Sequence, residues 1–224
     1  MRRFLDATLG RFMRHFLFIL VRTYYALFYN VSCSNKHLLQ DTPGALILST
    51  HVSRHDGPML AAILYTTARL RPTVHYNEYY SWSQWLPMHV VSAIPMSSPR
   101  KWPAEKRQKR KEDTLEIIHK VMENGSCILL FPAGRVRRQE REIIKPGLSG
   151  VHDIMGYAPD TPVMVLRIDG LGKFQTARYD GFWSFLGIKK GRRHVNVRLD
   201  RVTHLDPSKP LDDFNAELEE LLNS

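Results

Sequence analysis

Three short, continuous apolar runs constrain the fold of this chain more than any other feature. The runs are LILS within 41–50, CILLF within 126–134 and VMVL within 161–170, and a glycine or proline stands shortly before each. A half-exposed strand alternates apolar and polar residues, whereas a strand covered on both faces is apolar at consecutive positions. The runs therefore predict buried strands of one sheet with helices on both sides.

Helical patterns lie between these strands. The clearest covers 103–125, where Pro103 stands near the start and Gly125 supplies the stop. Further helices are predicted at 57–70 and 210–223, and further strands at 72–78, 90–95 and 194–202. Strands that alternate with helices predict an α/β fold, a single domain with a mostly parallel mixed sheet flanked by helices. A chain of 224 residues is long enough to bury such a core.

Residues 3–29 predict one amphipathic helix ahead of the sheet. Its apolar stripe recurs every three, four or seven residues, at Leu5, Leu9, Phe12, Phe16, Leu20 and Leu27. Two placements remain open, in a membrane surface or against the protein's own core. The apolar part is shorter than the roughly 20 residues that span a bilayer, and no cleavage site of a signal peptide follows it. We expect an amphipathic membrane-association segment over 1–40 and an α/β domain over 41–224.

The overall composition favours an anionic partner. The net charge is +10 at pH 7, which suits nucleic acid, an anionic membrane surface or a phosphorylated substrate. Charge alone does not choose among the three. The two cysteines, Cys33 and Cys127, are too few for the disulfide framework of a small secreted domain.

The apolar run at 46–48 stops abruptly at Ser49-Thr50-His51, and Asp56 follows five residues after His51 in THVSRHD. Sites in open α/β sheets lie at the carboxyl ends of strands, and a carboxylate that fixes an imidazole's tautomer lets its other nitrogen act as a base. This interpretation makes His51 the base and Asp56 its orienting group. The alternative is a loop histidine beside an aspartate that caps the following helix, with Pro58 just inside it.

A second strand ends in a basic loop, LLFPAGRVRRQER at 129–141. Gly134 allows backbone N–H groups to approach a ligand closely, and neighbouring arginines form a phosphate clamp. Arg135 and Arg137 are the arginines that we expect in the site. Arg100, which follows the strand predicted at 90–95, is a further candidate. The alternative is a solvated basic loop.

The blocks HVSRHD, LLFPAGRVR and TPVMVLRIDGL, in this order, resemble the lysophospholipid acyltransferase family. The family's histidine, four residues and aspartate match His51 and Asp56, and its Phe-Pro-Glu-Gly loop is matched in part by Phe131, Pro132 and Gly134. An apolar strand with a proline matches Pro162 and Val163, and Arg100 is the best positional candidate for the arginine of the remaining block. The resemblance covers about 45–200 and makes 41–224 an acyltransferase domain.

One departure from the family concerns the acceptor. Ala133 stands where the family usually has a glutamate, and RVR replaces Thr-Arg-Ser. In the family this loop holds the acceptor's phosphate and glycerol. The change leaves the His51 and Asp56 pair intact and makes another lysolipid head group an alternative acceptor.

The resemblance implies a specific reaction. An acyl chain moves from an acyl thioester, acyl-CoA or acyl carrier protein, to the free hydroxyl of a lysophospholipid, most simply 1-acyl-glycerol-3-phosphate, which gives phosphatidic acid. His51 would be the base and Asp56 its partner. The phosphate would be bound by Arg100, Gly134, Arg135 and Arg137, while the loop residues Phe131, Pro132 and Ala133 position the acceptor.

The reaction implied by the resemblance also determines which cofactors and partners we expect. No cofactor and no metal are expected, because His51 and His55 have helical ligand spacing but lack the adjacent glutamate of a zinc-protease helix. The expected partners are an anionic phospholipid membrane, the lysolipid, and acyl-CoA or an acidic acyl carrier protein, with no nucleic acid. We expect a peripheral or monotopic protein on the cytoplasmic face of the cell membrane. The alternatives are a basic membrane- or nucleic-acid-binding module without catalysis, and a thioester hydrolase.

Overall fold

The computed structural model describes residues 2–53, 56–64, 66–82, 88–89, 91–96, 99, 101–137, 140–170 and 193–224. A seven-stranded sheet forms its centre, in the order β1-β7-β6-β2-β5-β3-β4. Every neighbouring pair of these described strands is parallel except β6 and β7, which are antiparallel. The predicted mostly parallel mixed sheet is confirmed. The strands are β1 Tyr29–Ser34, β2 Leu46–Ser49, β3 Leu70–His75, β4 Ile94–Met96, β5 Cys127–Leu130, β6 Val163–Asp169 and β7 Arg193–Val202.

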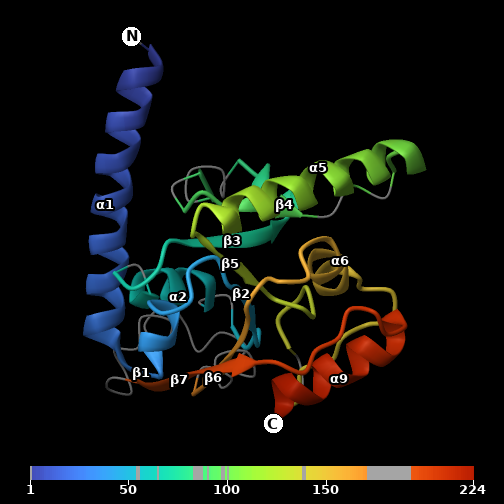
Figure 1. Ribbon diagram of the computed structural model, residues 1–224. Coiled ribbons are helices and arrows are strands. Elements are labelled where there is room, and N and C mark those ends of the chain that lie inside the picture. Colours follow the sequence, from blue (N-terminus) through green and yellow to red (C-terminus); the bar gives the residue numbers. More distant parts are fainter. Residues whose placement is uncertain are drawn as a thin grey trace.

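Helices cover both faces of this sheet (Figure 1). One core cluster joins Ile47, Leu129 and Leu166 of the sheet to α1 and α2, and the other joins Leu48 and Leu130 to α5, α6 and α9. Successive strand residues point to opposite faces, so consecutive positions are all buried and the runs read as continuously apolar. The helices are α1 Arg2–Phe28, α2 Asp56–Leu64, α3 Tyr76–Tyr79, α5 Ala104–Glu123, α6 Gly150–Tyr157 and α9 Leu211–Asn223, with a 3-10 helix η1 at Lys36–Leu39.

The sheet begins earlier in the chain than the sequence indicates. β1 pairs with β7 along its whole length, so residues before 41 contribute a strand to the sheet. Its sequence, YNVSCS, is polar at alternate positions and largely exposed, as suits an edge strand. The helix predicted at 57–70 is also shorter than expected, because α2 ends at Leu64 and Leu70 already belongs to β3.

The predicted N-terminal helix is present as α1, which extends beyond the rest of the molecule at its N-terminal end (Figure 1). Near its C-terminal end Tyr25 is buried in the core beside α2. Four other apolar side chains of α1 stay exposed: Phe16 at 54%, Ile19 at 66%, Leu20 at 54% and Leu27 at 62%. Part of the apolar stripe therefore does not pack on the protein's own core. Within the described part of the chain, no helix combines the length and the hydropathy needed to cross a bilayer.

Candidate active site

His51 lies just past the carboxyl end of β2, a central strand of the sheet, and its imidazole is hydrogen-bonded to Asp56. Nδ1 of His51 and Oδ2 of Asp56 are 2.8 Å apart. A carboxylate oxygen accepts hydrogen bonds, so Nδ1 is the donor, and in the neutral imidazole Nε2 then has the free lone pair. The His51 side chain is 19% exposed, so a substrate can reach it. The pair has the arrangement of a general base and its orienting carboxylate.

Asp56 is the first residue of α2, and its side chain is fully buried. Besides His51, Oδ2 accepts from the N–H of Val52 at 2.7 Å and from the N–H of Ser53 at 2.9 Å. All three donors belong to the loop before α2. Among the described residues, Asp56 therefore organises the loop around His51 and does not cap the helix, in contrast to the alternative interpretation of the sequence.

The basic loop after β5 contacts His51 at two points. The ring of Phe131 stacks on the imidazole, with the centroids 4.3 Å apart and the planes inclined by 26°. The backbone N–H of Arg137 donates to the carbonyl oxygen of His51 at 2.7 Å. β2 and β5 are adjacent parallel strands, so the loops at their carboxyl ends meet at one edge of the sheet. The structure thus brings together the two motifs, which are about 80 residues apart in the sequence.

The turn at 131–137 leaves part of its backbone available. Gly134 has a φ of +62°, and its N–H donates to the carbonyl of Phe131 at 2.9 Å, which closes the turn. Within the described part of the chain, the N–H groups of Arg135 and Val136 make no hydrogen bond. The Arg135 side chain is exposed, whereas Arg137 is half-buried and its Nη1 donates to the carbonyl of Glu140.

Three other predicted site residues remain, two of them in this turn. Pro132 and Ala133 are buried within the turn, and their side chains are apolar, so neither side chain can hydrogen-bond a ligand. Arg100 lies outside the described residues.

Sequence reasoning missed one residue of this site, Glu142. Its side chain is fully buried, and its Oε2 accepts from the backbone N–H of His51 at 3.2 Å. Burial raises the pKa of the Glu142 carboxyl, and the hydrogen bond from His51 partly offsets this shift. The surrounding sequence, RRQERE, reads as a solvated polar loop and gives no signal of a buried carboxylate.

A surface hollow of about 480 Å³ lies elsewhere, between residues 141–146 and α9. Asp212, Glu219 and Glu220 are among the residues that line it, and neither His51 nor Asp56 is. Carboxylates repel an anionic ligand, so this hollow is not the candidate active site. The hydrogen bonds around His51 define that site instead.

The fold of this chain is also found in a solved structure. The structure is similar to the crystal structure of the 1-acyl-sn-glycerophosphate (LPA) acyltransferase PlsC from Thermotoga maritima, with a TM-score of 0.58 and 14% sequence identity. The alignment covers 94% of this chain and 78% of that chain. At this identity the likeness establishes a shared fold.

The family follows from the sequence itself. The family model described as Acyltransferase matches residues 30–168, more than half of the chain, and this range contains both loops of the site. The chain belongs to the Acyltransferase family and is an acyltransferase, which confirms the family resemblance of its motifs. No curated protein matches the sequence significantly.

Proposed function

We propose that this acyltransferase moves an acyl chain from a thioester to the free hydroxyl of a lysophospholipid, with His51 as the general base. The observation that carries the proposal is the 2.8 Å contact between Nδ1 of His51 and Oδ2 of Asp56. This contact fixes the tautomer in which Nε2 accepts a proton. An alcohol is a weak nucleophile until a base removes its proton, so a base of this kind is what the reaction requires.

The reaction balances without any further group. Nε2 takes the hydroxyl proton while the hydroxyl oxygen attacks the thioester carbonyl carbon. The tetrahedral intermediate collapses, the C–S bond breaks, and the imidazolium gives its proton to the departing sulfur. The products are an ester and a free thiol, and the buried Asp56 carboxylate stabilises the imidazolium between the two proton transfers. Neither a cofactor nor a metal takes part in this proposal.

The basic loop is the proposed binding site for the acceptor's phosphate. The N–H groups of Arg135 and Val136 and the exposed Arg135 guanidinium offer donors on one turn. Arg137 has further N–H donors besides the one bonded to Glu140, and Gly134 lets the turn adopt its left-handed conformation. Arg100 stays part of the proposal on its sequence position alone. Because these donors suit a phosphate, 1-acyl-glycerol-3-phosphate is the proposed acceptor.

The donor is proposed to be acyl-CoA or an acidic acyl carrier protein, since both present a thioester on an anionic carrier. The net charge of +10 favours either one electrostatically. Anionic phospholipid, the lysolipid and the donor are thus the proposed partners, and the cytoplasmic face of a membrane is the proposed location.

A panel of acceptors tests the proposal. Purified protein is mixed with each donor and with lysolipids that carry phosphate, phosphoethanolamine, phosphocholine or phosphoglycerol head groups, and the products are identified by mass. We expect a diacyl product, formed fastest from the lysolipid with the bare phosphate. A faster reaction with another head group assigns the loop to that acceptor and corrects the proposed one. Free fatty acid without diacyl lipid contradicts the proposal and supports a thioester hydrolase.

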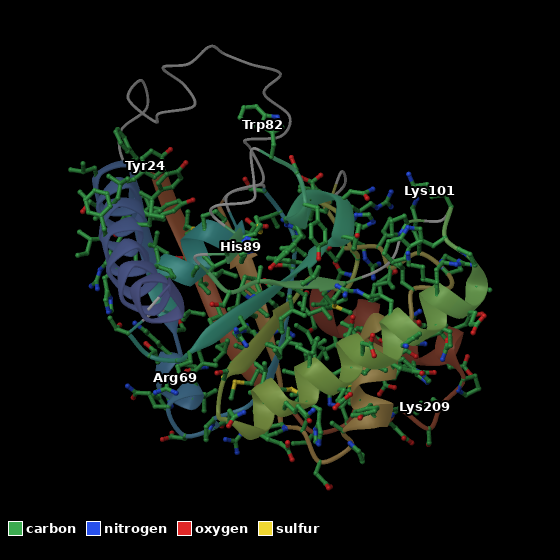
Figure 2. The ribbon with its side chains drawn as sticks, turned by 90° about the horizontal axis from the view of Figure 1, so that it is seen from above. Tyr24, Arg69, Trp82, His89, Lys101 and Lys209 are labelled. Atoms are coloured by element: carbon green, nitrogen blue, oxygen red, sulfur yellow. The ribbon has the colours of Figure 1, made fainter. Side chains whose placement is uncertain are left out.

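Membrane association is proposed to occur through α1. Its exposed side chains Phe16, Ile19, Leu20 and Leu27 form an apolar surface, and Arg22 lies on the same helix. Trp82 stands clear of the sheet and helices, and its side chain is 93% exposed, which suits a second contact in the interfacial region (Figure 2).

Charged substitutions on α1 test this contact. The double variant Ile19→Glu, Leu20→Glu is expected to bind anionic vesicles at least about tenfold more weakly, because each buried aliphatic side chain contributes about 1.5–3 kcal/mol. Ile117→Glu is the matched control, since Ile117 is 45% exposed on α5. Co-sedimentation with vesicles measures the effect. Equal binding of the double variant and the wild type would rule out α1 as the membrane contact.

A further inference from the structure

Glu142 contacts the backbone of His51, whereas Asp56 contacts its ring. Its Oε2 accepts from the His51 N–H, and the neighbouring N–H of Arg137 donates to the His51 carbonyl. Both backbone polar groups of His51 are therefore bound, by Arg137 and Glu142, while Asp56 and Phe131 hold the ring. The imidazole is fixed at its side chain and at its backbone by separate parts of the chain.

The C-terminal helix α9 anchors Glu142 in turn. Oδ1 of Asn223 accepts from the Glu142 N–H at 2.8 Å, and Nδ2 of Asn223 donates to the Glu142 carbonyl at 3.0 Å. Glu219, one turn earlier on α9, accepts from the Ile144 N–H at 2.9 Å. Side chains of α9 thus form hydrogen bonds with backbone N–H and carbonyl groups of this loop. The last residues of the chain are linked to His51 through Glu142.

A side chain that only fills space does not need to be polar here. Glu142 is fully buried, and within the described part of the chain its Oε1 has no hydrogen-bond partner. Burial of an unpaired carboxylate oxygen is unfavourable, and Asp56, a second buried carboxylate, adds repulsion, while His51 and Arg137 offset part of it. An apolar side chain would fill the space without this cost, but it would leave the His51 N–H without its acceptor.

We infer that Glu142 is a positioning residue for His51, held in place by Asn223 of α9, so that the C-terminal helix sets the geometry of the base. The inference rests on the proposed function of His51. Glu142 acts through the backbone of His51 and does not itself contact the reacting atoms.

Four variants test the inference through their separate effects on kcat and on KM. Glu142→Ala is expected to lower kcat about 10- to 100-fold with KM little changed, since a displacement of about 1 Å in a catalytic group costs up to about 10²-fold. Glu142→Gln keeps an acceptor oxygen for the His51 N–H and is expected to stay within about threefold of the wild type. Asn223→Ala is expected to lower kcat about tenfold. Glu140→Ala is the matched control, because Glu140 is exposed on the same loop.

A measurement without substrate keeps this test separate from the proposed function. Diethyl pyrocarbonate modifies accessible imidazoles, and peptide mass analysis gives the rate at His51. We expect Glu142→Ala and Asn223→Ala to change this rate at least about threefold, whereas Glu142→Gln and Glu140→Ala leave it unaltered. If the wild type transfers no acyl chain to any lysolipid, the proposed function fails, and the modification rate alone decides the role of Glu142.

Two results would overturn the inference. One is a folded Glu142→Ala variant with the kcat and the His51 modification rate of the wild type. The other is a Glu142→Gln variant as impaired as Glu142→Ala, which would mean that the charge acts and not the acceptor. If Glu142→Ala does not fold, Asn223→Ala and Glu142→Gln decide, and wild-type values for Asn223→Ala contradict the link to α9.

Discussion

Replacement of His51 by alanine is expected to lower acyl transfer about 10²- to 10⁴-fold, the contribution typical of a positioned general base. The protein should stay folded. The imidazole is partly exposed, and its ring contacts in the described structure are the hydrogen bond to Asp56 and the stacking on Phe131. Turnover is measured as product formation, and folding by circular dichroism and thermal melting.

The control for this variant is His119→Ala. His119 lies half-exposed on α5 and pairs with Glu123 at 3.4 Å, so its loss removes an imidazole from a site unrelated to the base. It should leave kcat and KM unchanged. A His51→Ala protein that is folded and as active as the wild type would show that His51 is not the base.

Replacement of Asp56 is expected to affect both activity and stability. Asp56→Asn keeps the shape but removes the charge that stabilises the imidazolium, and we expect a decrease in kcat of about 10²- to 10⁴-fold. Asp56→Ala also leaves the N–H groups of Val52 and Ser53 without their acceptor, at about 1–3 kcal/mol for each buried donor. Kinetics with the asparagine variant and urea unfolding of both variants separate the two effects.

The two variants of Asp56 distinguish a catalytic from a structural carboxylate. A purely structural role predicts that Asp56→Asn, in which one oxygen still accepts from the loop, keeps nearly full kcat. The catalytic role predicts a large decrease in kcat for both variants and a large loss of stability only for Asp56→Ala. Wild-type kcat in a folded Asp56→Asn variant would therefore exclude the proposed partnership with His51.

The central sheet was predictable because its strands are buried on both faces. Leu46–Leu48 and Ile128–Leu130 are apolar at every position, which few other structures require. β1 was not predicted, since an edge strand needs burial on one side only and its polar alternate residues resemble a loop. The helix α6 was missed for a similar reason, because it is short and carries Gly150 and Gly156, which weaken any helical signal.

The candidate site also contains residues that the sequence predicted and one that it did not. His51 and Asp56 are five residues apart, and their place after a strand, together with the LLFPAGRVR block, predicted that they meet. Glu142 reaches the site through Asn223, which lies 81 residues further along the chain. No local pattern encodes such a contact, and a glutamate among arginines resembles a solvated residue. A contact between residues close in the sequence was therefore predictable, whereas contacts made by distant polar side chains required the fold.

The placement of α1 shows a further limit of the sequence. The amphipathic pattern at 3–29 suited the core and the membrane equally. In the structure, residues of the helix have two kinds of environment, because Tyr25 packs on the core while Ile19 and Leu27 stay exposed. The core placement therefore holds for Tyr25, and the membrane contact proposed for the exposed residues awaits the vesicle experiment.

One measurement tests the central claim most directly. The purified wild type and the His51→Ala variant are each mixed with vesicles that contain 1-acyl-glycerol-3-phosphate and with an isotope-labelled acyl thioester, and thiol release and lipid mass are followed together. The account predicts that the wild type releases one thiol for each labelled ester formed and that the variant forms almost no ester. Equal ester formation by both proteins, or thiol release by the wild type without any ester, would contradict it.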